Sequence, residues 1–225
     1  MAAVITGTPT ALNWGTSATP ASQNVTVPAD ATAVYFFWSY FKSSGGDGAG
    51  LASVTMDGTV ADAYYEFPVS STNSTTGTGV AAWYNRGTGT KAIQPVWDVA
   101  PEEGPSSCVA FVKDGNLTAW TAALGDAKTG TNVPTCSLTT VAGDLVLKFN
   151  QSYSSVPGVT ASWTDVLSVA ANNGEAGRLT SISASGTSLT CDGAATYNYS
   201  TVVAVSIPAG GGGGPTYTLM GQAVM

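Results

Sequence analysis

The chain has no histidine among its 225 residues, and this absence excludes several kinds of active site. Without an imidazole, neither a Ser-His-Asp nor a Cys-His catalytic arrangement can form, and most catalytic zinc sites are excluded too. The three cysteines, Cys108, Cys136 and Cys191, are odd in number and far apart. That spacing fits neither a disulfide framework nor a zinc site, so we expect small buried or half-buried thiols in strands.

Charge is also scarce. Only 9% of the residues are charged, against about 25% in an ordinary globular chain. The net charge is −7, which argues against binding to nucleic acid or to an anionic membrane. No apolar run approaches the roughly 18 residues of a membrane-spanning helix. The opening MAAVITGTPTALNWG lacks the basic start and apolar core of a secretory signal, so we expect no export by that route.

The densest aromatic cluster in the chain is the stretch AVYFFWSYF at residues 33–41. In a strand, Val34, Phe36, Trp38 and Tyr40 would face one way, and Tyr35, Phe37 and Phe41 would face the other. Both faces are apolar, which predicts a central strand covered on both sides. We therefore expect Phe36 and Trp38 in the interior.

Short apolar runs separated by Gly, Asn and Asp turns predict the other strands. An Asp57-Gly58 turn predicts a hairpin between 51–56 and 61–67, and Pro95 predicts an edge or a bulge in the strand at 91–99. Only 116–125 has helical spacing, enough for a turn or two. Further strands are predicted at 22–27, 79–85, 107–113, 137–141, 144–150, 162–170, 178–184, 188–191 and 197–207.

This pattern predicts an all-β, antiparallel, jelly-roll-like β-sandwich. The expected organisation is a single domain at residues 21–208, preceded by an extended N-terminal arm at 1–20. A glycine linker at 209–214 then leads to a C-terminal docking peptide at 215–225.

No catalytic, cofactor or metal site is predicted. A glycosidase needs two acids a set distance apart, but the candidate acids fall mostly at strand ends or in loops, which is typical of solvated turn residues. No ligand-spaced calcium loop surrounds Asp47 or the Glu102-Glu103 pair, and the glycine-rich 42–50 lacks phosphate-loop spacing. The candidate acids are Asp57, Asp62, Glu66, Asp98, Glu102 and Glu103.

Two groups of residues are predicted to bind partners. Trp14 and Trp120 lie outside the best strands and are candidates for an exposed surface that stacks on sugar or on a partner protein. The uncharged tail TYTLMGQAVM suits addition as a strand to an exposed sheet edge. Its predicted contact residues are Tyr217, Leu219, Met220 and Val224. The other four tryptophans, Trp38, Trp83, Trp97 and Trp163, fall in strands and are predicted to be core residues.

Six segments carry a resemblance to a known kind of module: VTVPADATAVYFF (25–37), LASVTMDGTVAD (51–62), GVAAWYNRGTGTKAIQPVW (79–97), SSCVAFVKDGN (106–116), AGDLVLKF (142–149) and TVVAVSIPA (201–209). In this order they resemble jelly-roll-like β-sandwich modules of tailed-phage virion proteins and bacterial surface proteins. These modules share no catalytic residues that could be transferred to this chain. Its longer middle loops and glycine-linked tail depart from the pattern.

The resemblance and the missing catalytic side chains together favour a non-enzymatic virion structural protein of a tailed phage. A head decoration or fibre-like protein is expected, assembled in the host cytoplasm and displayed on the virion surface. Its expected partners are other virion proteins of the capsid or tail and further copies of itself, with a trimer as the expected arrangement. The alternative is a carbohydrate-binding or adhesin module of a tail or cell-surface protein, which would bind a surface glycan.

Overall fold

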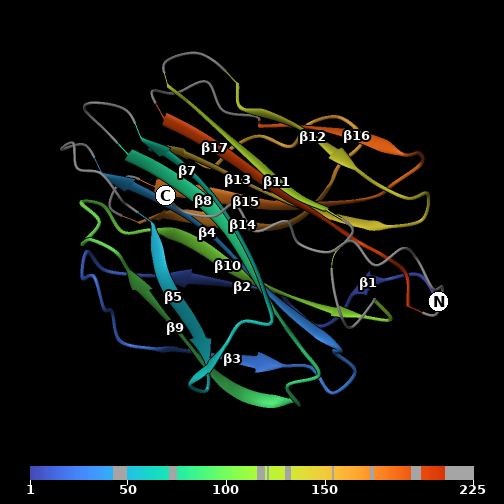
Figure 1. Cartoon of the computed structure of the whole chain (residues 1–225), viewed down its shortest axis with the longest axis horizontal. Coiled ribbons are helices and arrows are strands. Elements are labelled where there is room, and N and C mark those ends of the chain that lie inside the picture. The colour runs from blue at the N-terminus through green and yellow to red at the C-terminus, as the bar shows by residue number, and fades with distance from the viewer. Residues whose placement is uncertain are drawn as a thin grey trace, which may run out of the picture.

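The structure is a computed structural model that describes residues 1–42, 50–70, 75–115, 120, 122–129, 133–153, 155–172, 175–193 and 199–210. Every regular element in these ranges is a β-strand, and all strand pairs are antiparallel. The predicted all-β antiparallel sandwich is therefore confirmed, while the jelly-roll order stays a prediction. Figure 1 shows four sheets stacked in layers, with β3 and β9 in the lowest layer and β12 and β16 in the uppermost.

Two larger sheets form the middle of the stack. The first is six-stranded. Its edge is formed by β1 (Val4–Ile5) and β2 (Thr10–Asn13), which pair one after the other along β10 (Ser106–Lys113). The strands β4 (Ala33–Lys42), β8 (Thr75–Tyr84) and β7 (Ala63–Ser70) follow in that order. The second is five-stranded, in the order β11 (Ala122–Thr129), β17 (Tyr199–Ile207), β13 (Leu145–Tyr153), β15 (Glu175–Ser183) and β14 (Thr164–Asn172).

Two smaller sheets cover the outer faces. A four-stranded sheet lies on the six-stranded one, and its order is β3 (Gln23–Val27), β9 (Gly89–Trp97), β5 (Leu51–Met56) and β6 (Thr59–Val60). A two-stranded sheet lies on the five-stranded one and consists of β12 (Thr135–Thr139) and β16 (Ser188–Asp192). The buried side chains form three separate apolar clusters, one in each interface between neighbouring sheets.

Strand β4 lies between two of these clusters, as its two apolar faces predict. Tyr35 and Phe37 belong to the cluster shared with the five-stranded sheet. Phe36, Trp38 and Tyr40 belong to the cluster shared with the four-stranded sheet. All five side chains are fully buried, so the predicted interior position of Phe36 and Trp38 is confirmed.

The predicted hairpin after Met56 is right in its turn and wrong in its second strand. Asp57 and Gly58 both have positive φ, 49° and 75°, as a two-residue hairpin turn requires. The strand that returns beside β5, however, is only the two-residue β6. The chain then crosses to the six-stranded sheet, where β7 pairs with β8. The hairpin therefore ends after two residue pairs, because β7 pairs instead with β8 of the six-stranded sheet along its whole length.

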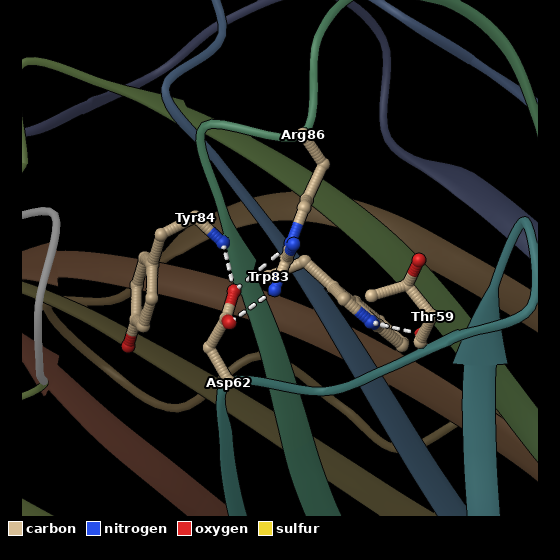
Figure 2. Close-up of polar contacts among 5 residues, drawn as sticks. All are labelled: Thr59, Asp62, Trp83, Tyr84 and Arg86. Carbon is tan, nitrogen blue, oxygen red and sulfur yellow. Dashed lines mark hydrogen bonds and ion pairs between the residues drawn. The ribbon is translucent and has the colours of Figure 1, made fainter.

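Asp62 fixes the point where the chain crosses between these two sheets (Figure 2). Its backbone N donates to Ala82 O at 2.8 Å, and its Oδ2 accepts from the backbone N of Tyr84 at 2.8 Å. Arg86 forms an ion pair with the same carboxylate. These contacts anchor the start of β7 to the end of β8, which makes Asp62 a structural residue.

Two further local predictions have different outcomes. The helical spacing at 116–125 is misleading at its end, because residues 122–125 begin strand β11 and pair with β17, while residues 116–119 and 121 lie outside the described residues. Pairing with the buried strand β17 outweighs a weak helical pattern of alanines and leucines. Pro95 behaves as expected of proline. Strand β3 reaches only to Ile93, so Pro95 faces no strand on that side of β9.

Candidate functional sites

Trp14 and Trp120 do not present exposed rings, so the predicted stacking surface is wrong. Trp14 is 1% exposed, and its Nε1 donates to Ser107 Oγ at 2.6 Å. It also packs edge-on against Phe36, with ring centroids 6.5 Å apart. Trp120 is 7% exposed and lies in the cluster between the six- and five-stranded sheets.

Pairing of the N-terminal arm explains the burial of Trp14. Strands β1 and β2 both pair with β10 and extend the six-stranded sheet. The chain after β2 then carries Trp14 into the cluster that contains Phe36 and Trp38. Local sequence could not reveal this position, because β10 follows the arm by about 90 residues, and such long-range pairing is not encoded in local pattern.

Two of the candidate acids, Asp57 and Asp62, lie at chain turns and have partners on other strands. Asp57 Oδ1 accepts from the backbone N of Ala92 at 2.8 Å, and Asp57 Oδ2 lies 3.1 Å from Lys91 Nζ. The backbone hydrogen bond and the lysine lower the pKa of Asp57. In the described part of the chain, no three acids or cysteines come together as a metal site would require.

Glu66 and Asp98 are the exception, because the fold brings these two candidate acids together. Glu66 Oε1 and Asp98 Oδ2 lie 2.9 and 3.1 Å from the position that a Cβ atom at Gly50 would take. Glu66 Oε1 accepts from the backbone N of Leu51 at 2.9 Å, and the hydroxyl of Tyr64 lies 2.6 Å from Oε2. Burial raises the pKa of Glu66, and the charge of Asp98 raises it further.

The surroundings of Glu66 favour a structural role for this glutamate. The Tyr64 ring stacks on Trp38 with centroids 5.5 Å apart, and its hydroxyl also lies 3.0 Å from Leu51 O. Both oxygens of Glu66 are therefore occupied in joining β7 to the start of β5.

Lys148 is the least expected group in the interior. Its side chain leaves β13 on the face opposite Leu147 and is fully buried. The ammonium donates to Thr160 Oγ1 at 2.7 Å and to Asp192 O at 2.9 Å, and it lies 4.1 Å from the centre of the Trp163 ring. Burial lowers the pKa of Lys148 to about 8.

The thiols of Cys136 and Cys191 lie in the same interface as Lys148. The two residues are direct partners in the β12–β16 pair, and both belong to the cluster between the two- and five-stranded sheets. The predicted burial of all three cysteines as free thiols in strands is confirmed. Sequence spacing alone did not reveal that two of them face each other.

A groove of about 390 Å³ lies where the N-terminal strand meets the five-stranded sheet. Its lining is uncharged: Ala2, Ala3, Val4, Ile5, Gly143, Leu145, Ser181 and Ser183. Gly210 lies beside Met1, whose neighbour Ala2 lines the groove, since Met1 N donates to Gly210 O at 3.0 Å. The chain therefore leaves its last described residue close to this groove.

Several residues of interest lie outside the described part of the chain. They are Asp47 of the glycine-rich loop and the predicted contact residues of the tail, Tyr217, Leu219, Met220 and Val224. No family of proteins, curated protein or solved structure matches this chain. Within the described ranges, the structure contains no helix long and apolar enough to cross a membrane.

Proposed function

We propose that this chain is a non-enzymatic structural protein of a tailed-phage virion. In this proposal it is a head decoration or fibre-like protein that binds the capsid surface or neighbouring subunits. It is assembled in the host cytoplasm, works on the virion surface as a homo-oligomer, with a trimer as the expected form, and has no bound cofactor. The sequence resemblance to β-sandwich modules of virion proteins suggests this role.

The observation that carries the proposal is the position where the chain leaves the sandwich. Gly210 is held by a hydrogen bond from Met1, whose neighbour Ala2 lines the uncharged groove, and by its own N–H, which donates to Asp114 O at 2.6 Å. The residues that follow are four glycines and then the uncharged peptide 215–225. An apolar peptide on a glycine linker is costly to leave in water unless it binds a surface.

A neighbouring copy of this chain is the occupant we propose for the groove. Strand β1 pairs with β10 along one edge, and Val4 is 40% exposed. An extended peptide can therefore be added along β1 as a further strand. Peptide and groove are both uncharged, so no ionised side chain would be buried without a partner.

The surface charges also fit association with protein rather than with nucleic acid. Four cations with described side chains, Arg86, Lys91, Lys113 and Arg178, each form an ion pair with an aspartate. Their charges are thus largely neutralised and form no basic patch that would attract phosphate. The glycan-binding alternative depended on an exposed Trp14 or Trp120, and their burial removes that support.

Deletion of residues 215–225 tests the proposal on particles. The truncated protein should keep the melting temperature of the full chain and lose most of its occupancy on purified virions, measured by quantitative mass spectrometry. A Ser183→Arg variant, which places a charge in the groove, should lower occupancy in the same way. Ser188→Arg, at an exposed position of the two-stranded sheet, is the matched control.

Each result of this experiment has a definite meaning. Absence of the full-length protein from purified particles contradicts the virion role. Full occupancy of the truncated protein contradicts the role of the tail, and normal occupancy of Ser183→Arg contradicts the groove as its receptor. Light scattering that shows only monomer at high concentration, together with monomers on the particle, contradicts the oligomer.

A further inference from the structure

Cys136 and Cys191 are placed opposite each other in the outermost sheet of the stack. They are direct partners in the antiparallel ladder, and the Cys191 thiol donates to Leu189 O at 3.9 Å. Both side chains point toward the five-stranded sheet, as their shared apolar cluster requires. Cys108, the third cysteine, belongs to a different cluster, between the six- and five-stranded sheets.

The hydrogen bonds at the two ends of this ladder define the geometry of the pair. Gly193 N donates to Pro134 O at 2.7 Å, and Thr140 N donates to Thr187 O at 3.1 Å. Hydrogen-bonded pairs recur at every second position of an antiparallel ladder, and Cys136–Cys191 falls on that series. The Cα atoms of such a pair are about 5.5 Å apart, which lies within the range of about 4.4–6.8 Å found in disulfides.

We propose that Cys136 and Cys191 are a redox-active pair that closes into a cross-strand disulfide when the protein meets a small disulfide oxidant. Side chains of a hydrogen-bonded pair stand somewhat farther apart than a disulfide prefers, so the Cβ atoms must approach by about 1 Å. The two-stranded sheet can supply this shift, because it is peripheral and sheets of two strands are marginally stable alone.

The exchange proceeds in two balanced steps with glutathione disulfide as the oxidant. Cys136, which is 7% exposed, is the first nucleophile, because Cys191 is fully buried. The Cys136 thiolate attacks one sulfur of the oxidant, and one glutathione leaves as the thiolate, which takes up a proton. The Cys191 thiolate then attacks the Cys136 sulfur of the mixed disulfide and releases the second glutathione. Two electrons pass from the protein to the oxidant, and both thiol protons end on the released glutathione.

Lys148 lies close enough to influence this chemistry. Its positive charge favours the thiolate of Cys191, while the neighbouring Cys136 thiol and burial raise the pKa of Cys191. The raised pKa slows the exchange at neutral pH, so we expect the closure to be slow and faster in alkaline buffer. The position of the pair in the ladder, rather than its titration, carries the proposal.

The biological role of this disulfide rests on the proposed function, because a virion protein moves from the host cytoplasm to the outside of the cell. The reducing host cytoplasm keeps the pair as thiols during assembly, whereas the medium outside the cell permits a disulfide. Closure would join β12 to β16 covalently and fasten the outer sheet after release. The chemistry itself can be tested on the purified chain alone.

The test uses the full-length reduced protein, incubated with glutathione disulfide at pH 8.5 and then digested for peptide mapping. We expect a single link between Cys136 and Cys191, a mass loss of two hydrogen atoms, and reversal by dithiothreitol. The melting temperature should rise by about 5–10 °C on oxidation, as a disulfide closing a long loop predicts. Cys108→Ser should keep all of these changes, whereas Cys136→Ala and Cys191→Ala should lose them.

Three outcomes would overturn the inference: no linked peptide after prolonged incubation, a stable mixed disulfide that never resolves, or a link through Cys108. Mapping of the wild-type chain decides this even if a cysteine variant fails to fold. The disulfide and the virion role can fail separately. If the disulfide forms but the protein is missing from purified particles, only the virion role is refuted. A protein present on particles without a link refutes only the disulfide.

Discussion

Gly79 lies directly opposite Trp38 in the ladder between β4 and β8, and the indole ring covers the position where a side chain at Gly79 would begin. A Cβ atom there would stand 2.2 Å from Trp38 Cζ2 and 2.5 Å from the backbone oxygen of Tyr65. The ring is fully buried and stacks on Phe36 and Tyr64, so it has no free space into which to move. A glycine is required here to make room for the ring.

Gly79→Ala should therefore destabilise the protein. We expect the free energy of unfolding to fall by about 1–3 kcal/mol, as in other overpacked cores, measured by urea denaturation followed through tryptophan fluorescence. Gly186→Ala is the control, because no atom lies within 4 Å of its added Cβ. Equal stability of the two variants would show that β8 does not pair with β4 in this register.

Phe36→Ala should be among the most damaging substitutions in the chain. Phe36 is fully buried between Trp14 and Trp38, and its removal leaves a cavity in the interface with the four-stranded sheet. The expected loss in the free energy of unfolding is about 3–5 kcal/mol. Val60→Ala, at a position that is 64% exposed, should change it by less than about 0.5 kcal/mol. A loss under about 1 kcal/mol for Phe36→Ala would contradict the burial of this face of β4.

Lys148→Met should change how stability depends on pH. The pKa of Lys148 is lowered from 10.5 to about 8 by burial, so between these values the unfolded chain binds more protons than the folded one. Stability from this group therefore rises with pH through that window and is lowest below pH 8. The free energy of unfolding of Lys148→Met, measured relative to that of the wild type, should therefore fall by about 2–3 kcal/mol between pH 7 and pH 10.5.

Comparison with a second lysine makes the Lys148 result specific. Asp30 raises the pKa of Lys113 by accepting a hydrogen bond from it at 2.9 Å. The stability that Lys113 supplies is present at neutral pH and is lost as the pH rises through its folded pKa, so Lys113→Met should show a trend of opposite sign. Parallel curves for Lys148→Met and wild type from pH 7 to 10.5 would rule out a buried ammonium.

The sequence predicted those parts of the fold that are encoded locally. The two apolar faces of β4 are visible in a short window of sequence, and so is the Asp57-Gly58 turn. These features depend on strand periodicity and turn conformation, which neighbouring residues determine. Predicted strand positions were therefore close to those observed, for example 107–113 against β10 at Ser106–Lys113.

Pairing between distant strands accounts for what sequence could not predict. Trp14 is buried because β2 pairs with β10, and Cys136 meets Cys191 because β12 pairs with β16. Lys148 lies on the face of β13 opposite Leu147, and that face looks polar in the sequence, which gives no sign that another sheet covers it. Neither the partner of an edge strand nor the cover of a sheet face can be inferred from local periodicity.

The pairing of the N-terminal strands with β10 has a consequence for synthesis on the ribosome. Leu12 O accepts a hydrogen bond from Ser107 Oγ, 95 residues later in the chain. At about 5–20 residues per second, the N-terminal strands emerge roughly 5–20 s before their partner. During this interval Leu12, Trp14 and the aromatic strand β4 have no β10 to pair with and offer an apolar surface to a holding chaperone. A nascent chain stalled before residue 106 should therefore remain bound to such a chaperone, whereas release should begin once β10 has left the exit tunnel.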